Sequence, residues 1–140
     1  MDVEIGSNLY RNTDGTIEVQ GVPQIQIALK EPSKLLINFA LFDENGRMVA
    51  KLVDSTLMFN ERRAYEISKT STRITLAHAE SKQVVLQMDV KGQNHIVCSQ
   101  AAFRSIKGHL VEVSSKEWKI DKQQASGTTH DANGGAVKIG

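Results

Sequence analysis

The stretch "LLINFALFDENGRMVAKLV", residues 35–53, holds two apolar segments on either side of a polar turn. The first eight residues are apolar except for Asn38, which predicts a strand covered on both faces. Residues 43–46 end in Asn-Gly, the strongest short-range signal for a tight reversal between strands. We therefore expect a β-hairpin here, with Gly46 at a positive φ that other residues adopt only with strain.

The same kind of segment recurs along the chain. From Gly15 onward, apolar residues mostly alternate with polar ones, the spacing that places them on one face of a strand. Ile25, Ile27 and Leu29 in "QIQIAL" are one example. Such segments continue to "EWKI", residues 117–120, and turns rich in Gly, Asn, Ser and Lys separate them. Since no segment among them predicts a long amphipathic helix, the fold class expected is all-β.

An internal repeat suggests how these strands are arranged. The segment "GRMVAKLVDSTLMF", residues 46–59, resembles "GHLVEVSSKEWKI", residues 108–120. The alignment pairs Gly46 with Gly108 and Val49 with Val111, and we expect these four residues to be structural. Such repeats indicate a short β-solenoid, a stack of coils. A β-sandwich is the alternative, because short strands with frequent turns give the same pattern.

The composition divides the chain into three regions. Residues 1–14 are expected to form an N-terminal arm, and residues 15–120 an all-β domain with internal repeats. Residues 121–140 contain four glycines and no apolar side chain larger than alanine before Val137. Such a segment buries too little apolar surface to offset its ordering entropy, so we expect a polar tail or linker.

Composition also limits the location and the partners. Lys and Arg total 17 against 16 Asp and Glu, so no excess charge draws the whole molecule to nucleic acid or to an anionic membrane. The single cysteine, Cys98, cannot form an internal disulfide, which favours a reducing compartment. No apolar run approaches the roughly 18 residues of a membrane span, and the N-terminus does not resemble a signal peptide. We expect a soluble protein in the cytoplasm of a bacterial or phage-infected cell.

The residues that could carry catalysis or bind a metal do not form a known pattern. The histidines, at positions 78, 95, 109 and 130, lack metal-ligand spacing. His95 and Cys98 would lie on opposite faces of a strand, which separates a thiol from its potential base. No glycine-rich loop joins a strand to a helix to hold phosphate. We therefore expect no catalytic site, no metal and no cofactor, and a protein that is not an enzyme.

One compact basic and aromatic cluster is the candidate binding surface. Arg62, Arg63 and Tyr65 follow one another closely in a polar turn, where they would contact phosphate or stack on a base. The alternative is that the two arginines are simply solvated.

The run "ALFDENGRMVAKLVDSTLMFNERRAYEI", residues 40–67, resembles the accessory β-helical modules of His-Asn-His endonuclease-associated and phage-associated bacterial proteins. The resemblance covers roughly residues 40–120. It implies a small β-solenoid module that associates with itself, with a trimer as the first expectation. The endonuclease motif itself is missing, so nuclease activity is not implied.

These observations lead to two functional hypotheses. The first is a non-catalytic assembly and binding module that forms a homo-oligomer and contacts a protein partner. It rests on the repeat and on apolar residues that exceed what a thin core would hide, namely Met58, Phe59, Ile106 and Trp118. The alternative is a targeting domain that helps an enzyme contact DNA or RNA, and it rests on Arg62, Arg63, Lys69 and Arg73 and on the family resemblance. Neither hypothesis involves a membrane.

Overall fold

The computed structural model describes residues 2–6, 8–30, 34–60, 63–92 and 94–113. Over these residues the chain is all-β, which confirms the predicted fold class. No helix in this part of the chain is long and apolar enough to cross a membrane. The expected tail, residues 121–140, lies outside the described residues, and so does Trp118.

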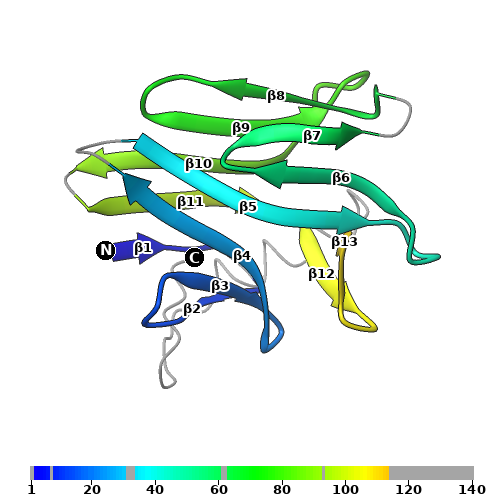
Figure 1. Ribbon diagram of the computed structural model, residues 1–140, viewed down its shortest axis with the longest axis horizontal. Coiled ribbons are helices and arrows are strands. Elements are labelled where there is room, and N and C mark those ends of the chain that lie inside the picture. The colour runs from blue at the N-terminus through cyan, green and yellow to red at the C-terminus, as the bar shows by residue number, and fades with distance from the viewer. Residues whose placement is uncertain (1, 7, 31–33, 61–62, 93, 114–140) are drawn as a thin grey trace.

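The strands form two sheets (Figure 1). The five-stranded sheet contains, in spatial order, β1 (Asp2–Glu4), β11 (His95–Ala101), β10 (Val84–Gly92), β9 (Arg73–His78) and β8 (Tyr65–Lys69). The eight-stranded sheet has a main path of β12 (Phe103–Ile106), β13 (His109–Glu112), β5 (Lys34–Phe42), β4 (Val22–Lys30), β3 (Thr16–Val19) and β2 (Leu9–Arg11). In the same sheet, β6 (Met48–Val53) pairs with β5, and β7 (Thr56–Asn60) pairs with β6.

Strands that follow one another in the sequence mostly pair as antiparallel neighbours, as the hairpin signals predict. Among the described strands, the parallel pairs are β1 with β11 and β13 with β5. Successive coils of a β-solenoid stack through parallel pairs. The β-solenoid is therefore not confirmed, although the all-β class does not depend on it.

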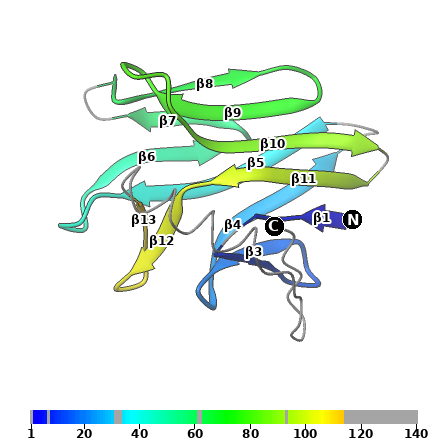
Figure 2. The same cartoon turned by 180° about the vertical axis from the view of Figure 1, so that it is seen from behind.

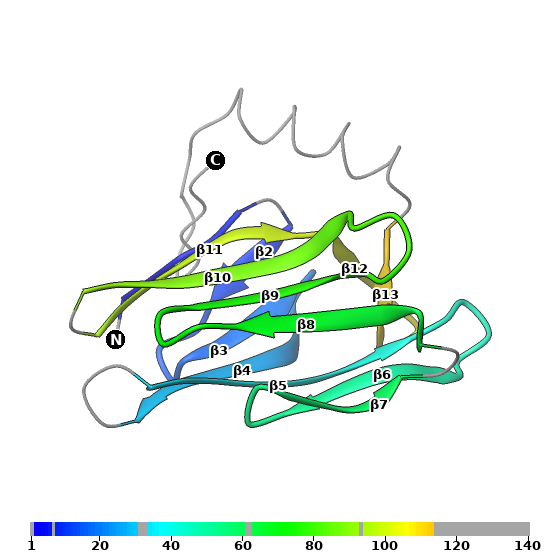
Figure 3. The same cartoon turned by 90° about the horizontal axis from the view of Figure 1, so that it is seen from above.

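The two sheets lie as layers around one core. Figure 3 shows β8 to β11 in one layer and β5 to β7 in the other, and Figure 2 shows β1 beside β11 from behind. Apolar side chains from both sheets join a single buried cluster, including Ile37 and Leu41 from one and Leu86 and Ile96 from the other. Burying one apolar face of each sheet in this way is the main stabilising contribution to such a fold.

Strand β5 is the centre of the larger sheet. It pairs with β4 through residues 34–38 and with β6 through residues 39–42, while Phe42 also meets Val111 of β13. Leu35, Ile37 and their alternate neighbours are buried, whereas the residues between them are only partly covered. The expectation that both faces are covered thus holds fully for one face only, the face that contacts the core.

Two glycine turns lead into strands on either side of β5. Gly46 has φ 82°, and its N–H donates to the carbonyl of Asp43 at 3.0 Å. Asn45 is not at positive φ, so the reversal is a three-residue loop that ends on the glycine instead of a two-residue Asn-Gly turn. Gly108 has φ 81° and follows Lys107 at φ 51°, which is the two-residue turn with positive φ at both positions.

Residues 1–14, expected to form an arm, contribute two strands. β1 pairs with β11 in the five-stranded sheet, and β2 pairs with β3 in the eight-stranded sheet. Val3, Ile5 and Leu9 are buried in the core. The described part of this segment is therefore integrated into both layers of the domain.

Candidate functional site

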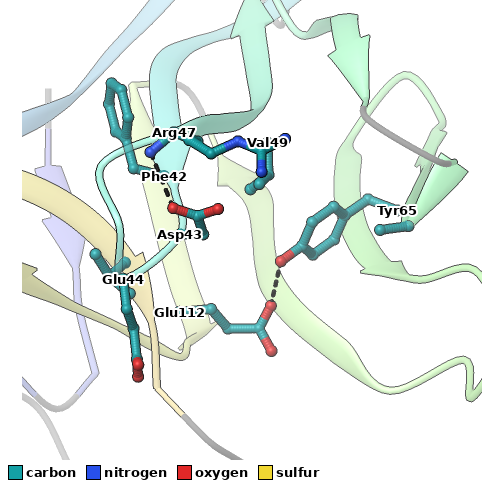
Figure 4. Close-up of a pocket in the computed structure, with 9 residues that line it drawn as sticks. Phe42, Asp43, Glu44, Arg47, Val49, Tyr65 and Glu112 are labelled. Carbon is teal, nitrogen blue, oxygen red and sulfur yellow. Dashed lines mark hydrogen bonds between the residues drawn. The ribbon is translucent and has the colours of Figure 1, made fainter.

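A hollow of about 420 Å³ opens where the turn between β5 and β6 faces the start of β8 and the end of β13 (Figure 4). These segments are far apart in the sequence, and the pairing of β13 with β5 at Phe42 brings them together. The residues that line the hollow are Phe42, Asp43, Glu44, Arg47, Val49, Ala64, Tyr65, Val111 and Glu112. We refer to these nine residues as the Glu112 hollow.

The turn between β5 and β6 fixes one wall of the hollow. The Asp43 Oδ1 atom accepts hydrogen bonds from the backbone N–H groups of Asn45 and Arg47, each at 2.9 Å. A short acidic side chain that bonds to the backbone of its own turn is a common device for ordering a loop. The turn therefore holds the Asp43 carboxylate at the rim of the hollow (Figure 4).

Glu112 connects the two sheets at the base of the hollow. Its side chain comes from β13 in the larger sheet, and the Tyr65 hydroxyl, from β8 in the other sheet, donates to its Oε1 atom. Glu112 Oε2 lies 2.6 Å from Nε2 of His78 on β9. The Tyr65 and His78 rings stack with centroids 5.2 Å apart. One carboxylate thus bonds to two stacked rings of the opposite sheet, an arrangement that holds its position closely.

The surroundings keep Tyr65 in its neutral form. Burial raises the pKa of the Tyr65 phenol, and both the hydrogen bond to Glu112 and the negative charge of Glu112 raise it further. The phenol therefore stays protonated and acts as a hydrogen-bond donor, because a carboxylate can only accept. Tyr65 has a positioning role toward Glu112 in this arrangement.

Apolar side chains form the remaining wall. Val49 on β6 and Val111 on β13 both line the hollow, with Val111 only 4% exposed and Val49 partly buried against the core. Phe42 packs against the His109 ring with centroids 4.4 Å apart. The two valines that the sequence alignment paired therefore lie around the same hollow, reached from opposite sides of β5.

The structure describes two of the three residues predicted to bind a ligand, Arg63 and Tyr65. Arg62 lies outside the described residues, and Arg63 is exposed. Tyr65 is 8% exposed and directs its hydroxyl to Glu112, so its ring is not an open platform on which a base could stack. Of the two described members of the expected cluster, Tyr65 lines the hollow and Arg63 does not.

Sequence reasoning missed Glu112, His78 and Asp43 as members of a site. A signal was present for Glu112, because it alternates with Leu110 in "HLVEV" and so shares the core-facing side of a strand. A carboxylate on that side needs partners, and Tyr65 and His78 supply them. The identity of those partners depends on which strands of the two sheets meet, which no local pattern encodes.

Cys98 and His95, considered as a thiol and its potential base, do not line the Glu112 hollow. Burial raises the pKa of the Cys98 thiol to about 12, so the reactive thiolate is scarce at neutral pH. His95 lies on the same strand, and its Nε2 is 3.5 Å from a carboxylate oxygen of Glu4. Within the described ranges, no group of three or more His, Cys, Asp or Glu side chains is arranged to hold a metal ion.

A second surface feature lies on the opposite side of β6. Among the described strands β7 pairs only with β6, so its other side is a sheet edge (Figure 3). Met58 is 63% exposed and Phe59 44% exposed on this strand, and Val53 on β6 is also exposed. We refer to β7 with these three side chains as the β7 edge.

The hairpin that carries the β7 edge is firmly held. Asp54 and Ser55 both have positive φ, which gives a two-residue turn between β6 and β7. The Ser55 hydroxyl accepts from the Ile37 N–H at 2.9 Å and donates to the Leu35 carbonyl at 3.0 Å. These bonds to the central strand β5 hold the edge in an extended, preformed shape.

Comparison with known proteins finds no matching family model, no matching curated protein and no matching solved structure. The resemblance to modules associated with His-Asn-His endonucleases therefore stays a prediction.

Proposed function

We propose that this chain is a non-catalytic binding and assembly module, a two-layer, sandwich-like β domain that associates with a second copy of itself. The observation that carries this proposal is the β7 edge, an open strand edge with exposed Met58 and Phe59. Open edges present unpaired backbone N–H and C=O groups that readily pair with another chain.

Strand β7 itself lacks two of the features that usually prevent such pairing, proline and charge. Its sequence "TLMFN", residues 56–60, contains no proline and no charged residue. Natural edge strands are commonly protected by proline, by lysine or by a covering segment. Burial of the exposed apolar side chains would add about 25 cal/mol for each Å² removed from water. Both the backbone and the side chains of β7 thus favour association.

The geometry of this edge favours a dimer. When β7 pairs with β7 of a second copy in antiparallel orientation, the same surface is used on both chains, and the contact closes with two-fold symmetry. The trimer implied by the family resemblance would require β7 to pair with a different surface. A dimer is therefore the assembly that we propose.

The test is the particle mass measured by light scattering coupled to size-exclusion chromatography over a range of concentrations. We expect a dimer that dissociates on dilution. The double variant Met58→Lys with Phe59→Lys should be monomeric, because charged side chains on the edge oppose pairing. The matched control, Gln26→Lys with Ser68→Lys, adds the same charge at exposed positions of β4 and β8 and should remain dimeric. A wild-type monomer at every concentration would contradict the proposal.

The nucleic-acid alternative has less support. Its aromatic element, Tyr65, is buried against Glu112, which leaves the exposed Arg63 as the described candidate for a phosphate contact on that turn. Binding through phosphate weakens steeply as salt rises. Salt-dependent binding of single-stranded DNA or RNA by the monomeric variant would restore this alternative.

A further inference from the structure

We infer that the Glu112 hollow is a binding site for an organic cation, an ammonium or guanidinium group on a short alkyl stem. The inference concerns a different surface from the β7 edge and does not depend on self-association. It rests on the shape of the hollow, on its charge, and on the way its main carboxylate is held.

The shape and the lining suit a ligand with one polar and one apolar end. The hollow encloses about 420 Å³, within the range of small-molecule sites. Phe42, Val49 and Val111 provide an apolar wall, and the acidic groups lie at the rim and the base. Such a division matches an alkyl stem that packs on the valines and a charged head that reaches the carboxylates.

The charge of the lining selects a cation. Among the described residues that line the hollow, three carry a carboxylate, Asp43, Glu44 and Glu112, and one carries a guanidinium, Arg47. The carboxylates of Asp43 and Glu112 lie on different sides of the same space (Figure 4). A positive group between them would reduce their mutual repulsion and form charge-assisted hydrogen bonds.

The carboxylate of Glu112 is ready to accept such bonds without rearrangement. Tyr65 and His78 each contact one of its two oxygens and hold it in place. A carboxylate has about four acceptor positions, so one further bond at each oxygen remains possible. Because the group is already ordered, binding costs little additional entropy.

The probes are N-acetyl-lysine methylamide and its uncharged analogue N-acetyl-norleucine methylamide, added to ¹⁵N-labelled protein and followed by amide chemical shifts. We expect saturable shifts for the lysine probe at the amides of residues 43–49, 65 and 111–112. The norleucine probe should bind at least about tenfold more weakly, because it cannot form charge-assisted bonds. Higher salt should also weaken binding of the lysine probe.

Variants locate the binding site. Glu112→Gln keeps an oxygen for the Tyr65 hydroxyl but removes the charge, and we expect affinity for the lysine probe to fall about tenfold. Glu18→Gln on β3 makes the same change outside the hollow and should bind as the wild type does. If Glu112→Gln does not fold, Glu44→Gln at the exposed rim serves instead, with a smaller expected loss.

Two further probes complete the test. Equal binding of butylammonium and of a lysine flanked by glycines would assign the site to free amines, and tighter binding of the peptide would assign it to a basic side chain of a partner. Equal affinity for norleucine, preference for an N-acetyl-glutamate probe, or no shifts at the named amides would each overturn the inference.

Discussion

Strands β6 and β13 each follow a turn that ends on a glycine at nearly the same φ, and both flank the same central strand, yet they end in opposite environments. After Gly46, β6 leads to β7, where Met58 and Phe59 are exposed. After Gly108, β13 has Leu110 and Val111 fully covered and ends in Glu112, which bonds to the other sheet. Similar local sequences thus form one closed and one open side of β5, and we assign association to the open side.

The largest expected difference is between apolar residues of these two hairpins. Leu110 is fully buried, so Leu110→Ala leaves a cavity and should lower the free energy of unfolding by about 2–5 kcal/mol. Met58→Ala removes a side chain that is mostly exposed in the monomer. This substitution should change the free energy of unfolding by no more than about 0.5 kcal/mol. Chemical denaturation of both variants, at concentrations where the wild type is monomeric, measures the difference. Equal losses would contradict the contrast between the two sides.

The two glycine turns should be equally sensitive to substitution. Gly46→Val and Gly108→Val place a β-branched residue at φ near 80°, and each should cost about 1–3 kcal/mol. No atom lies within 4 Å of a Cβ built at either position, so the cost comes from the backbone and not from crowding. The control is Gly92→Val, which meets open space without a positive φ and should be close to neutral. A neutral Gly46→Val would show that the turn can relax to another conformation.

The two valines paired by the alignment differ in burial. If the repeat made them equivalent, Val49→Ala and Val111→Ala would cost the same. Val111 is 4% exposed whereas Val49 is partly exposed at the rim of the hollow. We therefore expect Val111→Ala to cost about 1–3 kcal/mol and Val49→Ala less, measured by thermal or chemical denaturation. A larger cost at Val49 would mean that the open side of β5 contributes more to stability than its burial indicates.

The contact between the sheets has a dependence on pH that follows from Tyr65. Burial raises the pKa of its phenol above the ordinary value of 10.0, so the unfolded chain loses this proton at a lower pH than the folded chain. The contribution of the protonated Tyr65 phenol to the free energy of unfolding is fully present below pH 10.0 and is lost as pH rises above that value. Tyr65→Phe should cost about 1 kcal/mol at neutral pH through loss of the hydrogen bond to Glu112.

The measurement is the melting temperature on either side of about pH 10, where tyrosine ordinarily ionises. It should fall more for the wild type than for Tyr65→Phe, which has no proton to lose at this position. Tyr10→Phe, on β2, removes the same hydroxyl at another position, and its melting temperature should fall with pH as steeply as that of the wild type. Identical slopes for the wild type and Tyr65→Phe would mean that the phenol is not held neutral by the fold.

The sequence predicted the local features of the fold better than the long-range ones. Alternation and turn residues predicted an all-β chain and a positive φ at Gly46, because both are properties of a few adjacent residues. The strands β1 and β2 were missed, since three-residue strands contain too little alternation to distinguish them from an arm. The pattern that suggested a solenoid repeat also fits two hairpin strands on opposite sides of β5.

The candidate site was harder to predict for a similar reason. The Glu112 hollow combines residues of the β5–β6 turn, of β8 and of β13, which are distant in sequence. The cluster that the sequence singled out was contiguous, and its aromatic member, Tyr65, faces Glu112 because β8 directs it inward. The sequence held one indication of this site, because Glu112 is a charged residue at a core-facing position of a strand and therefore needs polar partners.

The most direct test of the central claim is amide hydrogen exchange in β7 at low and high protein concentration. Among the described strands of one copy, none pairs with the side of β7 that faces away from β6. Strand β13, by contrast, pairs with β12 on one side and with β5 on the other. We expect these β7 amides to exchange rapidly at low concentration and to become protected as the dimer forms, while the exchange of the β13 amides remains unchanged. Exchange in β7 that does not vary with concentration, in a sample whose mass shows association, would place the interface elsewhere and contradict the account.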